Sequence, residues 1–203
     1  MTQYFEIEQR DGAARIGKLM LSPELRTPCI LSTTELGKLE SPGPVVDAGS
    51  FWAVKSDEEF DVRVKQIRKK AGNGTLIILP HQAYPPAIPA ESLGKVEKFT
   101  ATSGENIEGP IGSLLRVGEK PEKTDLYVME GAGTLENNAR RFLETVIELK
   151  NHIPPDTALY APNLALPENI AMLVYLGIDV MDDMRAEIAA YSDIYLTVTG
   201  SFH

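Results

Sequence analysis

Cysteine is nearly absent from this 203-residue sequence, and its scarcity excludes two kinds of small protein. Cys29 is the only cysteine. Neither a disulfide framework within the chain nor a cysteine-rich zinc site can therefore form. A lone cysteine beside Pro28 is more typical of a small buried apolar residue than of a catalytic nucleophile.

Long apolar runs are missing as well. No stretch of 18 apolar residues occurs, so no membrane-spanning helix and no membrane partner are expected. The first eight residues are acidic and lack the apolar region of a secretion signal. We therefore expect a cytoplasmic protein.

Positive charge is in short supply. The chain has 20 Lys and Arg against 29 Asp and Glu, a net charge of −9. This balance argues against a broad basic face that binds nucleic acid without help from another chain. A local basic cluster still fits either an RNA-contacting strip or an ordinary solvated helix face, and it comprises Arg63, Lys65, Arg68, Lys69 and Lys70.

The sequence does contain the alternating apolar patterns of a folded α/β domain. Residues 4–8 and 14–21 alternate on either side of the turn signal Asp11-Gly12, which predicts an antiparallel hairpin. Hydrophobic residues make up 43% of the chain, enough for a core of ordinary size. We expect a single domain spanning 1–203, in which residues 1–31 form a hairpin cover and residues 32–203 form the main fold.

The main fold is predicted to consist of parallel βαβ units, because short strands alternate with amphipathic helices. Full (β/α)₈ barrels usually take roughly 250 residues, so a trimmed or incomplete TIM-like barrel is expected. Within 83–123 the pattern is weak, with an alternating piece at 98–102 and a strand or loop at 109–117. The other predicted strands are 29–31, 45–46, 75–79, 125–129, 158–161, 178–181 and 194–198, and the predicted helices are 57–70, 135–151 and 168–176.

Two aspartates, Asp47 and Asp182, end short apolar runs and are the first candidates for a functional site. An acid at the end of a buried strand is costly unless it is solvated, paired or used. In parallel barrels the active site gathers at the carboxyl ends of the strands. Both acids are therefore candidate catalytic residues.

Four segments resemble the tRNA-guanine transglycosylase superfamily, over about two thirds of the chain. Residues 5–28 resemble its opening hairpin, and Val46-Asp-Ala-Gly-Ser-Phe51 resembles its Asp-Ser-Gly-Gly-Phe motif. Tyr127-Val-Met-Glu-Gly-Ala-Gly133 falls where the family has a glycine-rich substrate loop. Residues 162–182 resemble its last strand-helix-strand. Within the superfamily, the sequence of residues 158–162 and 173–179 is similar to that of the archaeosine synthase type.

The resemblance implies a function in tRNA modification. Archaeosine synthases act on tRNA that carries 7-cyano-7-deazaguanine in the D-arm, and they add an amine to the nitrile. The family pattern places Asp182 at the position of the nucleophile and Asp47 at that of the acid that handles protons and holds the base. The implied substrate-binding residues are Gly49, Ser50, Phe51, His81, Gly131 and Gly133.

The resemblance also implies what lies outside this chain. The family's zinc site is absent, so no cofactor is expected here. The downstream nitrile-modifying motif and the PUA-like RNA-binding module are absent too, which predicts a carboxyl-terminal segment or separate chain as a partner besides tRNA, with a homo-oligomer as a further possibility.

Two alternatives stay open. One is a non-catalytic scaffold for a separate catalytic chain. The other is an unrelated small barrel enzyme acting on a sugar, which would need its two carboxyl groups within roughly 5–9.5 Å of each other.

Overall fold

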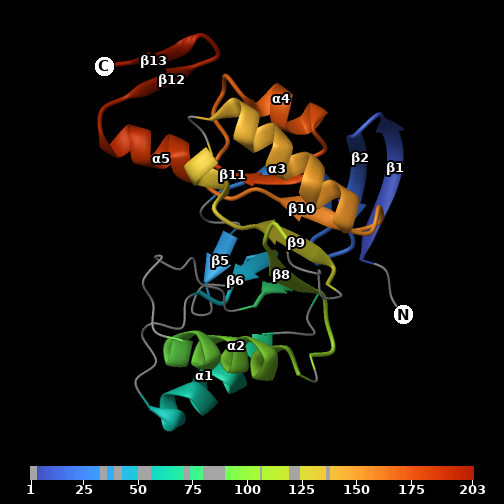
Figure 1. Ribbon diagram of the computed structural model, residues 1–203, viewed down its shortest axis with the longest axis vertical. Coiled ribbons are helices and arrows are strands. Elements are labelled where there is room, and N and C mark those ends of the chain that lie inside the picture. The colour runs from blue at the N-terminus through green and yellow to red at the C-terminus, as the bar shows by residue number, and fades with distance from the viewer. Residues whose placement is uncertain are drawn as a thin grey trace.

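A computed structural model describes residues 4–32, 36–38, 43–49, 56–70, 74–79, 90–105, 107–118, 124–135 and 138–203. Near its amino terminus, β1 (Phe5–Asp11), β2 (Ala14–Leu19) and β3 (Leu25–Thr27) form a three-stranded antiparallel sheet (Figure 1). The turn between β1 and β2 lies at Gly12, where φ is 60°. The predicted hairpin is therefore confirmed, with β3 as an additional strand.

The main body is an eight-stranded parallel sheet, which confirms the α/β class. Its order is β4-β11-β10-β9-β8-β7-β6-β5, and every neighbouring pair is parallel. The predicted boundary at residue 31 assigned β4 to the hairpin cover, but β4 pairs with β11 in this sheet. The strands are β4 (Cys29–Leu31), β5 (Leu36–Lys38), β6 (Val45–Asp47), β7 (Leu76–Ile78), β8 (Ile111–Leu115), β9 (Leu126–Met129), β10 (Ala158–Tyr160) and β11 (Val180–Asp182).

The sheet is curled. Strands β5 to β11 follow one another in sequence order, yet the first strand, β4, pairs with the last, β11. Among the described residues no pairing joins β4 to β5. The hydrophobic side chains on one face meet in a single interior cluster, as they would inside a curved sheet.

Alternate residues along each strand face opposite sides of the sheet. Val45 lies in the interior cluster whereas Val46 packs outside against α1. Val128 faces inward whereas Met129 faces the helices. The interior cluster also contains residues of β4, β7, β9, β10 and β11 and is closed at one end by the amino-terminal sheet, its buried members being Phe5, Leu19, Leu21, Leu31, Val45, Leu76, Ile78, Leu126, Val128, Ala158, Tyr160 and Val180.

Helices cover the outer face of the sheet at two places (Figure 1). One pair, α1 (Asp57–Lys70) and α2 (Ala90–Gly104), packs on β6 and β7, and the rings of Phe60 and Phe99 meet edge to face at 4.8 Å. The other pair, α3 (Ala139–His152) and α4 (Ile170–Tyr175), covers the strands from β8 to β11.

The predicted helix 135–151 is present as α3, which begins four residues later, at Ala139, and ends at His152. Phe142, Val146 and Leu149 are buried on one face. Asn138 caps its amino end by accepting a hydrogen bond from the Arg141 amide. A 3₁₀ turn, η2 (Ala132–Leu135), precedes the helix.

Two parts of the fold differ from the sequence-based expectation. The piece at 98–102 belongs to α2, in which Phe99 and Ser103, four positions apart, are buried on one face of the helix. The predicted last strand exists as β12 (Tyr195–Thr197), but α5 (Met184–Tyr191) precedes it and β13 (Gly200–Phe202) pairs with it as a hairpin. None of the described helices has the length and apolar character needed to cross a membrane.

Candidate functional site

Asp47 and Asp182 lie at the same end of the parallel sheet and face its interior. Each is the last residue of its strand, β6 or β11. Each also lies two positions after an inward-facing valine, Val45 or Val180, so the alternation of side chains directs both carboxylates inward. The two predicted catalytic acids therefore lie at the same end of the sheet and on the same face.

The carboxylate of Asp182 is held by three donors. The Tyr160 hydroxyl donates to Oδ2 at 2.6 Å, and the Asn163 amide donates to both oxygens at 2.9 and 3.0 Å. The Met184 amide donates to Oδ1 at 3.2 Å. The residue is only 3% exposed. Both oxygens therefore accept hydrogen bonds from the protein itself, which fixes the carboxylate in place.

Tyr160 reports on the electrostatics of this site. Burial, followed by the charge of Asp182, raises the pKa of its hydroxyl well above the ordinary value, so the group remains a hydrogen-bond donor. The charge of Asp47 raises this pKa too. Tyr160 thus responds to both of the acids at this end of the sheet.

Asp47 is oriented by the residue that follows it by two positions. The Gly49 amide donates to Asp47 Oδ1 at 2.7 Å. Gly49 has φ of 77°, a left-handed conformation that side chains other than glycine rarely adopt. The predicted substrate-binding Gly49 therefore positions the acid through its backbone.

Gly133 affects the position of Asp182 indirectly, through its close contact with Asn163. A Cβ atom at this position would lie 2.6 Å from the carbonyl oxygen of Asn163, so only glycine allows η2 to approach the loop after β10 so closely. Asn163 itself has φ of 54° and supplies the amide that holds Asp182. Gly131 lies in the same turn, where its carbonyl accepts from the Thr134 hydroxyl at 2.7 Å. The glycine-rich turn thus supports the loop that fixes Asp182.

An ion pair at the same end of the sheet was not predicted from the sequence. Arg116 follows β8 and Glu130 follows β9, and their side chains meet at 2.9 Å. Each lies two positions after an inward-facing residue, Leu114 or Val128. The side chain of each is 27% exposed. The carboxyl end of the sheet therefore has a guanidinium group as well as carboxylates.

Three predicted site residues, Ser50, Phe51 and His81, lie outside the described residues. Within the described ranges no group of three or more His, Cys, Asp or Glu side chains could hold a metal ion.

Four of the five residues of the basic cluster, all but Arg63, lie in the second half of α1, a helix that begins with acidic residues. This order suits the helix dipole, which favours acids at the amino end and bases at the carboxyl end. Arg68 donates to the Thr102 carbonyl of α2 at 3.0 Å. These features favour the interpretation of the cluster as an ordinary solvated helix face.

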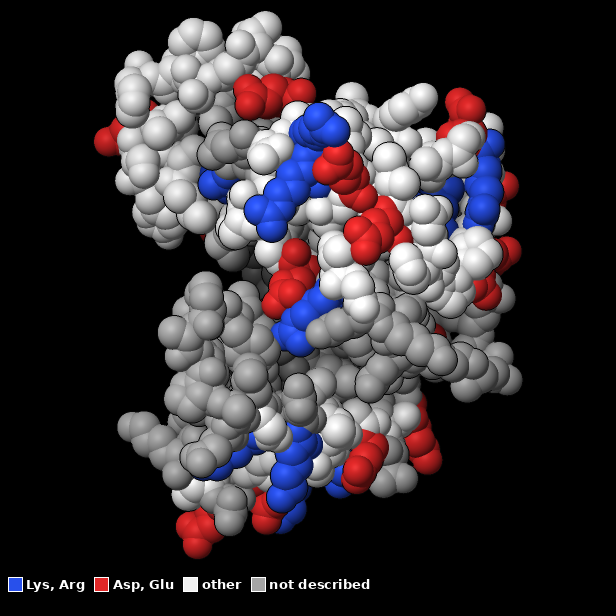
Figure 2. Space-filling model, in the orientation of Figure 1, with Lys and Arg blue, Asp and Glu red and all other residues white. Residues whose placement is uncertain are grey.

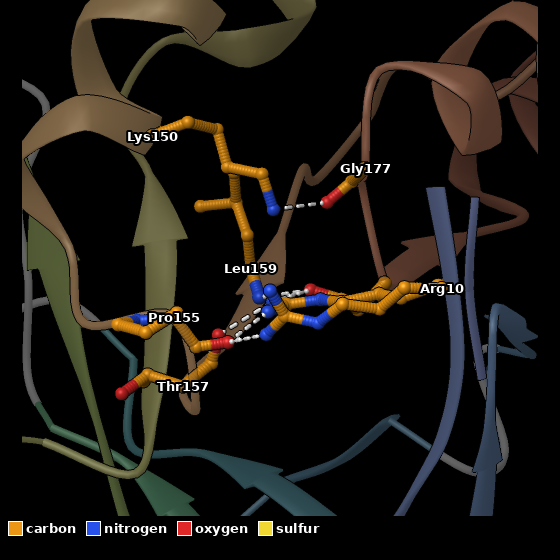
Figure 3. Close-up of polar contacts among 8 residues, drawn as sticks. Arg10, Lys150, Pro155, Thr157, Leu159 and Gly177 are labelled. Atoms are coloured by element: carbon orange, nitrogen blue, oxygen red, sulfur yellow. Dashed lines mark hydrogen bonds and ion pairs between the residues drawn. The ribbon is translucent and has the colours of Figure 1, made fainter. Parts of the chain in front are cut away.

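A second polar cluster lies at the opposite end of the sheet (Figure 3). Asp179 is fully buried just before β11, and Arg15 of β2 donates two hydrogen bonds to its carboxylate at 2.6 and 2.7 Å. The Leu159 amide donates to the same carboxylate at 2.7 Å. Arg15 also donates to the carbonyls of Pro155 and Thr157. Asp179 therefore anchors the amino-terminal sheet to the parallel sheet.

Lys150 of α3 borders this cluster and donates to the Gly177 carbonyl at 2.7 Å. Burial lowers the pKa of Lys150 to about 8. The charge of Asp179 opposes that effect, whereas Arg15 and Arg10 add to it. This end of the sheet is therefore filled by structural contacts, and the carboxyl end is where the candidate site lies.

The curled parallel sheet and the acids at its carboxyl end define an α/β protein that holds its functional groups where parallel strands end. No family model matches the chain. The chain is 73% identical over 205 residues to archaeosine synthase subunit alpha of Methanosarcina acetivorans, and the match covers all of this chain and 33% of that protein. It is 31% identical over 203 residues to archaeosine synthase of Haloferax volcanii, covering all of this chain and 31% of that protein.

The chain spans about a third of the length of these curated relatives. Identity of 73% over the whole chain shows that it is homologous to a part of archaeosine synthase, so the predicted resemblance to these proteins is confirmed.

Proposed function

We propose that this chain is the transglycosylase-like part of an enzyme that forms archaeosine, and that it binds tRNA bearing a 7-deazaguanine base. The observation that carries the proposal is the 73% identity, along the entire chain, with archaeosine synthase subunit alpha. The carboxyl end of the sheet supports it, because oriented acids and an arginine gather there.

The chemistry of the site suits a base that has been turned out of the RNA stack. Such a base is recognised by hydrogen bonds to its Watson–Crick edge. The N–H groups of a 7-deazaguanine match the carboxylate of Asp47, and its O6 acceptor matches the guanidinium of Arg116. The site therefore offers both the acceptors and the donor that this base requires.

Within this function, hydrogen bonds hold the carboxylate of Asp182 at the nucleophile position that the family resemblance implies. Both oxygens of Asp182 accept hydrogen bonds, from Tyr160, Asn163 and Met184. The reaction on the nitrile is assigned to the part of the protein that this chain does not include.

We also propose that the curled sheet is a trimmed (β/α)₈ barrel. Strand order supports this, since closing the gap between β4 and β5 would complete a ring of eight consecutive strands. The interior cluster supports it too, because it draws side chains from strands all around the curve. Among the described elements no helix separates β8 from β9, which makes the barrel shorter than usual.

A non-catalytic scaffold is the second candidate function. The occupied oxygens of Asp182 favour it, since the arrangement would also suit an inherited pocket that no longer takes a ligand. Binding of the free base separates the two candidates.

The test is calorimetric titration of the chain with 7-cyano-7-deazaguanine, at two temperatures so that a near-zero enthalpy does not hide binding. Loss of a hydrogen bond to a charged group costs about 1.5–3 kcal/mol, so Asp47→Ala should bind roughly 10- to 100-fold more weakly. Asp61→Ala, on the exposed face of α1, is the control and should bind as the unchanged chain does. Absence of heat at both temperatures would reject the pocket and leave the scaffold.

A further inference from the structure

The residues in the last part of the chain are all at least partly exposed to solvent. We call residues 184–203, which comprise α5, β12 and β13, the carboxyl-terminal lobe. None of its residues is buried. Five of its large apolar side chains are exposed to solvent by half or more, and they are Ile188 (50%), Tyr191 (91%), Tyr195 (72%), Val198 (74%) and Phe202 (55%).

The carboxyl-terminal lobe projects from the body (Figure 1). Its two strands pair only with each other among the described strands. A two-stranded hairpin alone in water is marginally stable at best, and it needs a third strand or a packed surface. In Figure 2 the lobe is largely white, at the upper left, whereas blue and red groups cover the neighbouring face. Exposed aromatic and apolar groups in such a patch are typical of an interface.

The composition of the lobe restricts what can cover it. Its charged residues are Arg185, Glu187 and Asp193. One arginine against two acids does not supply the positive charge that binds a phosphate backbone. A second copy of the chain would bring another net charge of −9 to the contact, which opposes association.

The length of the relatives indicates which polypeptide covers the carboxyl-terminal lobe. The curated relatives are about three times as long as this chain, so two thirds of each relative lies outside the match. We propose that the carboxyl-terminal lobe is the docking surface for the polypeptide that makes up those remaining two thirds. Tyr195 and Phe202 face each other in the β12–β13 register and form the centre of this surface. This interface is independent of base binding at Asp47.

The test co-expresses the tagged chain with the portion of the Methanosarcina acetivorans relative that the chain does not match, so that each folds in the presence of the other. Purification on the tag should recover the two polypeptides in about equal amounts. Tyr195→Ser should lower recovery of the partner at least tenfold, and Val198→Ser should lower it as well.

Tyr175→Ser is the matched control, because Tyr175 on α4 is 74% exposed but lies outside the lobe. It should leave recovery unchanged, as should Asp47→Ala. Circular dichroism will verify that each variant keeps its helix content. The proposal is overturned if the unchanged chain recovers no partner, if both lobe variants recover it normally, or if Tyr195→Ser instead abolishes self-association of the chain.

Discussion

Replacing the two members of the buried Arg15–Asp179 pair, singly and together, tests how the amino-terminal sheet is held to the parallel sheet. The side chains are 5% and 0% exposed. In Arg15→Met, the carboxylate of Asp179 keeps a single described donor, the Leu159 amide. In Asp179→Leu, the guanidinium stays buried with only two carbonyl acceptors. Removing one partner of a buried ion pair costs about 3–5 kcal/mol.

The double variant should cost far less than the two single costs added together. With both charges gone, no buried ion is left without its counterion. What remains is the loss of hydrogen bonds at the Thr157 carbonyl and the Leu159 amide, at about 1–3 kcal/mol for each group left unsatisfied, because the Pro155 carbonyl still accepts from Arg10. We therefore expect a double variant destabilised by about 2–6 kcal/mol where additivity would give about 6–10, and a coupling energy of about 4 kcal/mol.

Urea unfolding followed by circular dichroism measures the four free energies of the cycle. The exposed pair Arg140–Glu144 serves as the control, since its nitrogen–oxygen distance of 2.9 Å is similar but its side chains are 89% and 64% exposed. That pair should couple by no more than about 0.5 kcal/mol. Equal coupling in the two cycles, or additive costs at Arg15 and Asp179, would refute the assignment of a buried anchor.

Three further predictions concern single residues. Burial lowers the pKa of Lys150 to about 8 in the folded chain, whereas a free lysine has a pKa of about 10.4. Between these two pH values the unfolded chain binds more protons than the folded chain. The free energy of unfolding should therefore rise with pH in this range, by up to about 3 kcal/mol. Denaturation of Lys150→Met against pH should lack this rise, and a parallel curve for both proteins would contradict it. Gly133→Ala should lose roughly 1–3 kcal/mol because its methyl group meets backbone, whereas Gly94→Ala, in open space on α2, should gain up to about 1 kcal/mol; equal melting shifts would argue against the close contact. Arg116→Gln should weaken binding of 7-cyano-7-deazaguanine about tenfold in the calorimetric titration, and unchanged affinity would remove Arg116 from the site.

Much of the fold was predictable because buried apolar residues recur with the period of a strand or of a helix. The inward faces of short strands such as Val45–Asp47 and the buried stripe of α3 follow from spacing alone. The helix α2 was missed because Thr, Ser and Gly dilute its pattern, and tertiary packing of Phe99 decides its state. The helix α5 was missed because it buries no residue and so has no apolar stripe to detect.

The site was predictable only in part. Asp47 and Asp182 stand out because each ends an apolar run. The pair of Arg116 and Glu130 is brought together by the register of β8 on β9, which pairs Leu115 with Met129. The register between two strands cannot be read from the sequence of either strand. The contact between Arg15 and Asp179, which are 164 positions apart, could not be predicted for the same reason.

The central claim, that the carboxyl end of the sheet accepts a 7-deazaguanine, is tested most directly by following three backbone amides in NMR spectra. Gly49 and Asn163 donate to the acids at the proposed pocket, whereas Leu159 donates to Asp179 at the opposite end. Titration with 7-cyano-7-deazaguanine should shift the amide signals of Gly49 and Asn163 and leave that of Leu159 in place. Unmoved signals at saturating ligand, or a shift confined to Leu159, would contradict the claim.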